Sequence, residues 1–157
     1  MANEVMNLIT VTASEGLEAA VDEKLEELAR EFEVNGIPCS PCSVLRSFDH
    51  GEIEITSAWG PANAVQDYIV RSLGQIDPNI VVCNCFEEEF LQAVGARVAW
   101  LEVASITEAV DLSDLEFGSA DDEERQKRVS SAQEDCLEQA LTQRDQDLAR
   151  AREEIGW

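Results

Sequence analysis

Hydrophobic residues recur with two periods along the chain, and these periods predict most of its elements. The segment 5–13, VMNLITVTA, is rich in β-forming residues and is predicted to be a strand. In residues 15–34 apolar side chains recur three and four positions apart, with acidic residues on the remaining face, which indicates an amphipathic surface helix. Ser14 is the predicted N-cap of this helix, and Asn35 with Gly36 is predicted to end it.

A hairpin and a second helix are predicted next. Residues 43–48 and 52–59 are predicted to pair as strands around a short turn at residues 49–51. A helix is predicted over residues 61–74, because the proline that opens it lacks an N–H group that would have no partner in the first turn. Residues 79–86 form another β-rich run, so the element order is βαββαβ.

This order predicts an α+β fold with a ferredoxin-like antiparallel sheet, both helices lying on one face. Residues 96–105 are predicted to add an extra edge strand, and the acidic, turn-rich residues 110–120 to form a hinge. Residues 121–155 form a long C-terminal helix whose apolar seam is thin, so it must dock on the open sheet face or pair with another subunit. The expected organisation is a domain in 1–109, the hinge, and the helix in 121–157.

Trp59 stands where the second hairpin strand meets the start of the second helix. By the alternation of a strand, its ring is expected on the same side of the sheet as Ile53 and Ile55. We therefore expect Trp59 to pack in the core beneath that helix, and the alternative is an exposed binding anchor.

Charge is the largest signal in the composition, because 33 acidic residues against 11 basic ones give a formal net charge of −22. Such a surface repels nucleic acid and anionic membranes, so direct binding of either is excluded. Three interpretations remain: solvation at high salt, solubility alone, or imitation of a polyanion that captures a nucleic-acid-binding protein on its basic surface.

The compartment is predicted from what the sequence lacks. The opening residues contain no basic segment followed by an apolar core, and no apolar run approaches the about 20 residues that span a bilayer. Five cysteines, an odd number, do not suggest a disulfide framework. We therefore expect a cytoplasmic protein, within a host cell, that keeps its thiols reduced.

Two cysteine pairs offer the strongest metal hypothesis. Cys39 and Cys42 have the spacing of a zinc knuckle, and Cys83 and Cys85 share one face of a predicted strand. In a ferredoxin-like sheet, however, these pairs belong to opposite edges, about 14 Å apart. We therefore favour small buried side chains plus a loop dithiol, with a zinc-binding module as the alternative.

Catalysis and cofactor binding are not indicated. His50, the single histidine, lies in the predicted hairpin turn, and its neighbours supply no nucleophile with an orienting carboxylate. No glycine-rich phosphate loop is present, and the carboxylate clusters look uniformly solvated rather than paired in contrasting environments. We therefore predict a protein that is not an enzyme and has no cofactor.

The region from residue 55 to residue 98 resembles the YubB-type ferredoxin-like domain of plasmid and phage proteins. The resemblance is carried by Ser57-Ala58-Trp59, Pro61, Asp77-Pro78, Glu87 to Glu89 and Gly95, and the opening strand adds to it, so it covers about the first two-thirds of the chain. The family usually has a second proline where this chain has Ala62, and the long C-terminal helix is not part of its pattern. The resemblance implies a ferredoxin-like fold and a mobile-element origin, and no enzymatic activity.

These observations favour a non-enzymatic acidic protein of phage or plasmid type that inhibits a restriction or CRISPR protein of the host by DNA or RNA mimicry. The predicted partner-binding carboxylates are Glu23, Glu26, Glu27 and Glu31 on the first helix and Glu87, Glu88 and Glu89 beside the fourth strand. The main alternative is a structural module that forms a homodimer through residues 121–155.

Overall fold

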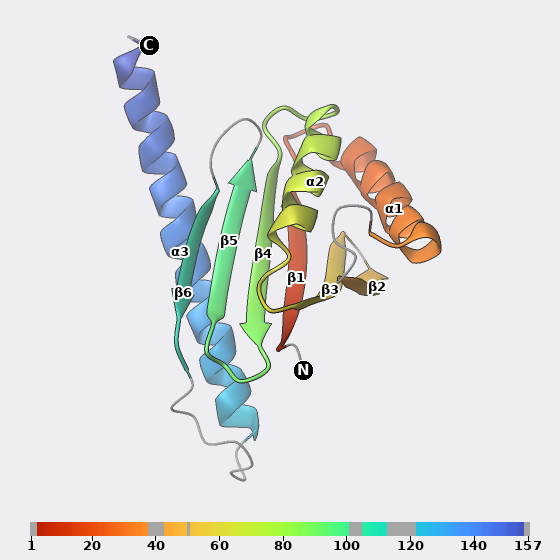
Figure 1. Cartoon of the computed structure of the whole chain (residues 1–157). Coiled ribbons are helices and arrows are strands. Elements are labelled where there is room, and N and C mark those ends of the chain that lie inside the picture. The colour runs from red at the N-terminus through yellow and green to blue at the C-terminus, as the bar shows by residue number, and fades with distance from the viewer. Residues whose placement is uncertain (1–2, 38–42, 50, 101–104, 113–121, 156–157) are drawn as a thin grey trace.

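The computed structural model describes residues 3–37, 43–49, 51–100, 105–112 and 122–155. Its strands form one six-stranded antiparallel sheet in the order β2-β3-β1-β4-β5-β6 (Figure 1). The elements are β1 (Glu4–Thr12), α1 (Glu18–Asn35), β2 (Val44–Asp49), β3 (Glu52–Ala58), α2 (Asn63–Gly74), β4 (Val81–Glu88), β5 (Val94–Trp100), β6 (Ile106–Val110) and α3 (Asp122–Glu154).

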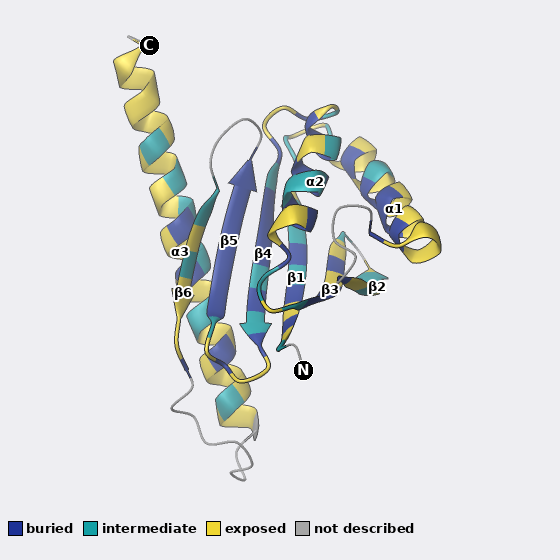
Figure 2. Cartoon of the chain, viewed as in Figure 1, coloured by how far each residue is buried: buried dark blue, intermediate teal, exposed yellow. Residues whose placement is uncertain are grey.

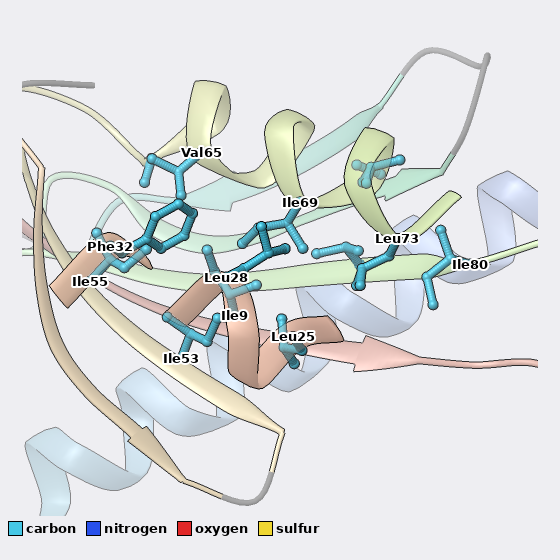
Figure 3. Close-up of a cluster of buried hydrophobic side chains, with 14 of the residues drawn as sticks. Ile9, Leu25, Leu28, Phe32, Ile53, Ile55, Val65, Ile69, Leu73 and Ile80 are labelled. Atoms are coloured by element: carbon cyan, nitrogen blue, oxygen red, sulfur yellow. The ribbon is translucent and has the colours of Figure 1, made fainter. Parts of the chain in front are cut away.

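The first four strands have the order β2-β3-β1-β4, and α1 and α2 lie on one face of them (Figure 1). This is the ferredoxin-like arrangement that the element order predicted. The main core lies between that face and the two helices, where apolar side chains of α1 and α2 meet those of the strands (Figure 3). Its larger buried members are Ile9, Leu25, Leu28, Phe32, Ile53, Ile55, Val65, Ile69, Leu73 and Ile80. Burial of each such side chain stabilises the fold by about 1.5–3 kcal/mol.

Two strands extend the sheet beyond β4, where the sequence predicted one. β5 pairs with β4 and β6 pairs with β5, so β4 is an interior strand and not an edge. Close pairing of β5 with β6 depends on Gly95, since a Cβ atom at that position would lie 2.1 Å from the carbonyl oxygen of Glu108.

The long helix α3 lies on the opposite face of the sheet, against β4, β5 and β6 (Figures 1 and 2). Its apolar seam forms two small clusters with side chains of the sheet and of the segments that flank the strands. One contains Cys83, Val98, Trp100, Leu137, Ala140 and Leu141, and the other Leu91, Val94, Leu112, Val129 and Ala132. The 33 residues of α3 span about 50 Å, more than twice the length of β5, so its last turns extend past the sheet with Leu148 and Ile155 exposed.

Several element boundaries differ from the sequence-based expectation. α1 begins at Glu18, after Leu17, and no side chain caps it. The predicted N-cap role of Ser14 is therefore wrong: its hydroxyl donates instead to Asp77 Oδ1 (2.8 Å). Within the predicted hinge, Val110 ends β6 and Leu112 is buried, whereas residues 113–120 lie outside the described part of the chain.

The prediction that Trp59 packs in the core is also wrong. β3 ends at Ala58, and Trp59 has a φ of 70°, in the left-handed region that favours glycine. This turn of the backbone interrupts the strand alternation from which the core position was predicted. The Trp59 side chain is consequently 73% exposed.

Candidate protein-binding surface at one end of the sheet

Exposed apolar and acidic side chains gather at the end of the sheet where β1 begins and β3 and β4 end. We call this region the Trp59 end and define it as Asn3, Glu4, Met6, Trp59, Glu87, Glu88, Glu89 and Phe90. Trp59, Met6 and Phe90 are among the large hydrophobic side chains that the fold leaves exposed. An exposed apolar patch with a polar rim is typical of a binding surface.

Hydrogen bonds hold the loop that carries Trp59 in one conformation. The Trp59 N–H donates to the Asn3 carbonyl oxygen (2.8 Å), which ties the loop to the start of β1. The Ser57 hydroxyl donates to the Gly60 carbonyl oxygen (2.7 Å), so the loop closes on the strand that leads into it. The exposed ring is therefore attached to a backbone that is fixed on both sides of it.

Asn7, buried in the middle of β1, holds the same loop through hydrogen bonds on both sides of Trp59. Its Oδ1 accepts the Ala62 N–H (2.9 Å) and the side-chain amide of Asn84 (2.9 Å). Its own amide donates to the Ser57 hydroxyl oxygen (2.9 Å) and to the carbonyl oxygen of Ile55 (3.1 Å). Because Asn7 is almost completely buried, these bonds are its means of replacing lost water contacts.

Glu88 and Glu89 are tied to the first residues of β1. The Asn3 side-chain amide donates to Glu88 Oε1 (2.8 Å), and Glu88 itself is buried. The Glu4 N–H donates to Glu89 Oε2 (3.0 Å), while Glu89 remains exposed. Both carboxylates therefore have fixed positions at the Trp59 end.

Glu87 points to the other side of β4, toward α3. Burial raises the pKa of its carboxyl group, and the nearby charge of Arg125 opposes that rise. A groove of ≈ 430 Å³ opens here between the start of α3, the start of β1 and the end of β4. It is lined by Glu4, Met6, Glu87, Glu88, Glu89, Leu91, Arg125, Gln126 and Val129.

The same sheet face continues as an acidic surface over β1, β2 and β3, which α3 leaves exposed. We call it the open sheet face and define it as Glu4, Met6, Val44, Glu52 and Glu54. By the strand register these residues lie opposite the core-facing Ile53 and Ile55. All five are exposed, Met6 by 46% and Val44 by 48%, so this face presents carboxylates and apolar side chains together.

The predicted carboxylates of α1 form a separate surface. Glu23, Glu26, Glu27 and Glu31 are all exposed on the helix, which covers the face of the sheet opposite α3. Glu27 pairs with Lys24 (3.4 Å) and Glu26 with Arg30, so part of their charge is compensated locally. The structure therefore does not bring these residues together with Glu87, Glu88 and Glu89.

The described thiols lie beneath α3. Cys83 and Cys85 face this helix, which contributes Cys136, and burial raises the pKa of all three thiols, that of Cys83 to about 11. Protonated thiols are poor nucleophiles and poor metal ligands. Among the described residues, no three or more His, Cys, Asp or Glu side chains gather as a metal site. Cys39, Cys42 and His50 lie outside that part of the chain.

Sequence reasoning placed Trp59 in the core, with an exposed binding anchor as the alternative, and it did not identify the anchoring role of Asn7. The exposure of Trp59 follows from a single dihedral angle, which strand periodicity does not contain. The anchoring role of Asn7 had a signal, since an asparagine occupies a core-facing position between Val5 and Ile9 of an otherwise apolar strand face. A polar residue at such a position needs buried hydrogen-bond partners.

None of the helices, as far as they are described, is long and apolar enough to cross a membrane. No family model, curated protein or solved structure matches the chain, and its resemblance to the YubB-type domain stays a prediction.

Proposed function

We propose that this protein is a non-enzymatic inhibitor that captures a nucleic-acid-binding protein of a host defence system through its acidic surface. The partner is a restriction or CRISPR protein whose basic surface otherwise holds DNA or RNA. In this proposal the carboxylates substitute for phosphates, and the inhibitor acts by competition without any chemical step.

The observation that supports this proposal is the composition of the open sheet face and the adjoining Trp59 end. Solvation alone requires charge but does not require large apolar side chains in water among the carboxylates. Protein interfaces combine such apolar groups with a polar surround. The exposed Met6, Val44 and Trp59 beside Glu4, Glu52, Glu54 and Glu89 therefore favour partner binding over acidity for solubility. The resemblance to a mobile-element domain supports the choice of a defence protein as the partner.

Charge reversal on each surface separately tests the proposal and locates the interface. One variant changes Glu4, Glu52 and Glu54 to Lys, a second changes Glu87 and Glu89 to Lys, and a third changes Glu23, Glu26, Glu27 and Glu31 to Lys. Purified restriction and CRISPR complexes are assayed for DNA binding in the presence of each variant. We expect the wild-type chain to displace DNA more strongly at low salt than at high salt, because screening weakens the attraction.

We expect the first two variants to lose this competition while their circular dichroism stays unchanged, since the altered side chains are exposed or only half-buried. The third variant reports whether α1 contributes as the sequence predicted. Retained competition by all three variants would contradict polyanion mimicry.

A second candidate, assembly through α3, is supported by the part of that helix beyond the sheet. Leu148 and Ile155 continue the apolar seam there and are exposed, Ile155 by 66%. If a second subunit covers them, L148D combined with I155D will convert a dimer to a monomer in sedimentation velocity. A wild-type chain that already sediments as a monomer would exclude this candidate.

A further inference from the structure

We propose that Trp59 is the anchor of the interface and that it binds the guanidinium group of an arginine from the partner, together with the exposed carboxylate of Glu89. This inference rests on the proposed function and specifies the chemistry by which the partner is recognised. It assigns a role to the most exposed aromatic side chain of the Trp59 end, which the core packing does not use.

The first argument is that the ring is exposed but its backbone is fixed. Trp59 is 73% exposed, and its loop is held by the hydrogen bonds to Asn3, Asn7 and within the Ser57–Gly60 turn. A side chain on a fixed backbone loses less conformational freedom when it binds than one on a mobile loop. Large aromatic residues presented in this way are frequent interface hot spots.

The second argument is that the backbone of Trp59, the backbone of Glu89 and the side chain of Glu88 all bond to the first residues of β1. The Asn3 carbonyl oxygen accepts a hydrogen bond from the backbone N–H of Trp59, and the Asn3 side-chain amide donates one to Glu88 Oε1. A single residue, Asn3, therefore links Trp59 to Glu88. Glu4 is the next residue of β1. It pairs with Ala58 of β3 on one edge of the strand, and on the other edge its carbonyl oxygen accepts the Glu89 N–H. Two interstrand spacings, about 10 Å, therefore separate the backbone of β3 from that of Glu89.

The third argument is charge, which selects the occupant. A cation binds the face of an indole ring, and arginine also donates paired hydrogen bonds to carboxylates, so both features of this site favour a guanidinium group. A nucleic acid base would stack on the ring equally well, but its phosphates would meet Glu89 and a chain of net charge −22. As the occupant of this site, a second copy of the chain or an anionic membrane is disfavoured by the same repulsion.

The test uses synthetic peptides of eight arginines or eight lysines as probes, titrated into the full ¹⁵N-labelled chain. The indole N–H signal of Trp59, assigned with a Trp59→Phe variant, reports contact with the ring, and calorimetry gives the dissociation constant. We expect this signal to move with the arginine peptide, and that peptide to bind more tightly than the lysine peptide. We expect Trp59→Ala to weaken arginine-peptide binding about tenfold and Trp59→Phe to weaken it less.

Val34→Ala is the matched control, since Val34 is an 80% exposed apolar residue near the end of α1, and it should bind as the wild type does. Two outcomes would overturn the inference while leaving the proposed capture of basic proteins intact: unchanged affinity of Trp59→Ala for the arginine peptide, or equal affinity of the wild type for both peptides. If neither peptide binds at low salt and no defence complex is captured, the proposed function itself fails.

Discussion

A tryptophan with a φ of 70° is an unfavourable residue for the stability of the free protein. For a bulky side chain the left-handed region costs on the order of 1–3 kcal/mol, and it persists only where surrounding contacts impose it. Here the contacts come from Asn3, Ser57 and Asn7. Such strain beside an exposed ring is understandable where binding, rather than stability, determines which residue occupies the position.

Trp59→Gly tests this interpretation through stability. Glycine adopts a positive φ without strain, and the ring makes little use of burial, so we expect the free energy of unfolding to rise by about 1 kcal/mol despite the greater freedom of glycine in the unfolded chain. Urea denaturation measures the change. If Trp59 packed in the core, its removal would instead lower the free energy of unfolding by about 3–5 kcal/mol. A decrease of that size would contradict the exposed position.

Asp77 joins the connection between α2 and β4 to the connection between β1 and α1. The pKa of its carboxyl group predicts how the stability of the fold depends on pH. Burial acts to raise the pKa of its carboxyl group, but hydrogen bonds from the Ser14 N–H and hydroxyl and from the Asn79 N–H outweigh burial, so the pKa lies below its usual 3.8. A lowered pKa in the folded state means that this carboxylate stabilises the fold above pH 3.8 and that its contribution is lost as the pH falls below that value.

Ser14→Ala removes the hydroxyl donor and should lower the free energy of unfolding by about 1–2 kcal/mol at neutral pH. The difference from the wild type should shrink below pH 3.8, where Asp77 becomes protonated in both proteins. Urea denaturation at neutral and acidic pH gives the comparison, with the exposed Ser131→Ala as control. A difference that stays constant with pH would show that the lost stability does not come from the Asp77 carboxylate.

At the scale of elements, hydrophobic periodicity predicted the helices and the hairpin, because these form from residues that are close together in the sequence. α1, α2, the β2–β3 hairpin and α3 all occur where apolar spacing placed them, because each buries one face. The pairing of β5 with β6 and the choice of sheet face for α3 depend on contacts between distant segments. The seam of α3 was compatible with either a sheet or a second subunit. The apolar side chains of β4 and β5 that its first turns bury decide in favour of the sheet there.

The reactivity of Cys83 reports whether α3 covers the sheet. Its thiol is buried beneath the helix and has a pKa of about 11, so we expect very slow alkylation by iodoacetamide at pH 8 in the native protein. Ala140→Arg places a long charged side chain at a fully buried contact of α3 and should increase the rate of alkylation at Cys83. Peptide mass spectrometry identifies the modified cysteine.

Ala149→Arg makes the same substitution at an exposed position of α3 and should leave the rate unchanged. Methyl signals of Ile53 and Ile69 show whether the main core stays folded in each variant. Rapid alkylation of Cys83 in the wild type would contradict the docking of α3.

At the scale of the whole molecule, a net charge of −22 opposes compaction at every pH where the carboxylates are ionised. We expect the melting temperature to rise as sodium chloride is added, because the Debye length falls from about 30 Å at 0.01 M to about 10 Å at 0.1 M. Differential scanning calorimetry measures this rise. The large apolar core should nevertheless keep the chain folded at low salt, and unfolding there would favour adaptation to a high-salt host over partner binding.

The positions of the end of α3 and the start of β1 determine how the protein can be attached to a surface. Helix α3 ends past one end of the sheet, whereas β1 begins at the other end (Figure 1). There the Asn3 carbonyl oxygen accepts the backbone N–H of Trp59. A support linked through the C-terminus therefore leaves the Trp59 end facing solution, while a tag fused before Asn3 would stand next to the indole ring. Capture experiments with tags at the two ends should differ in yield, and that difference maps the partner to one pole of the molecule.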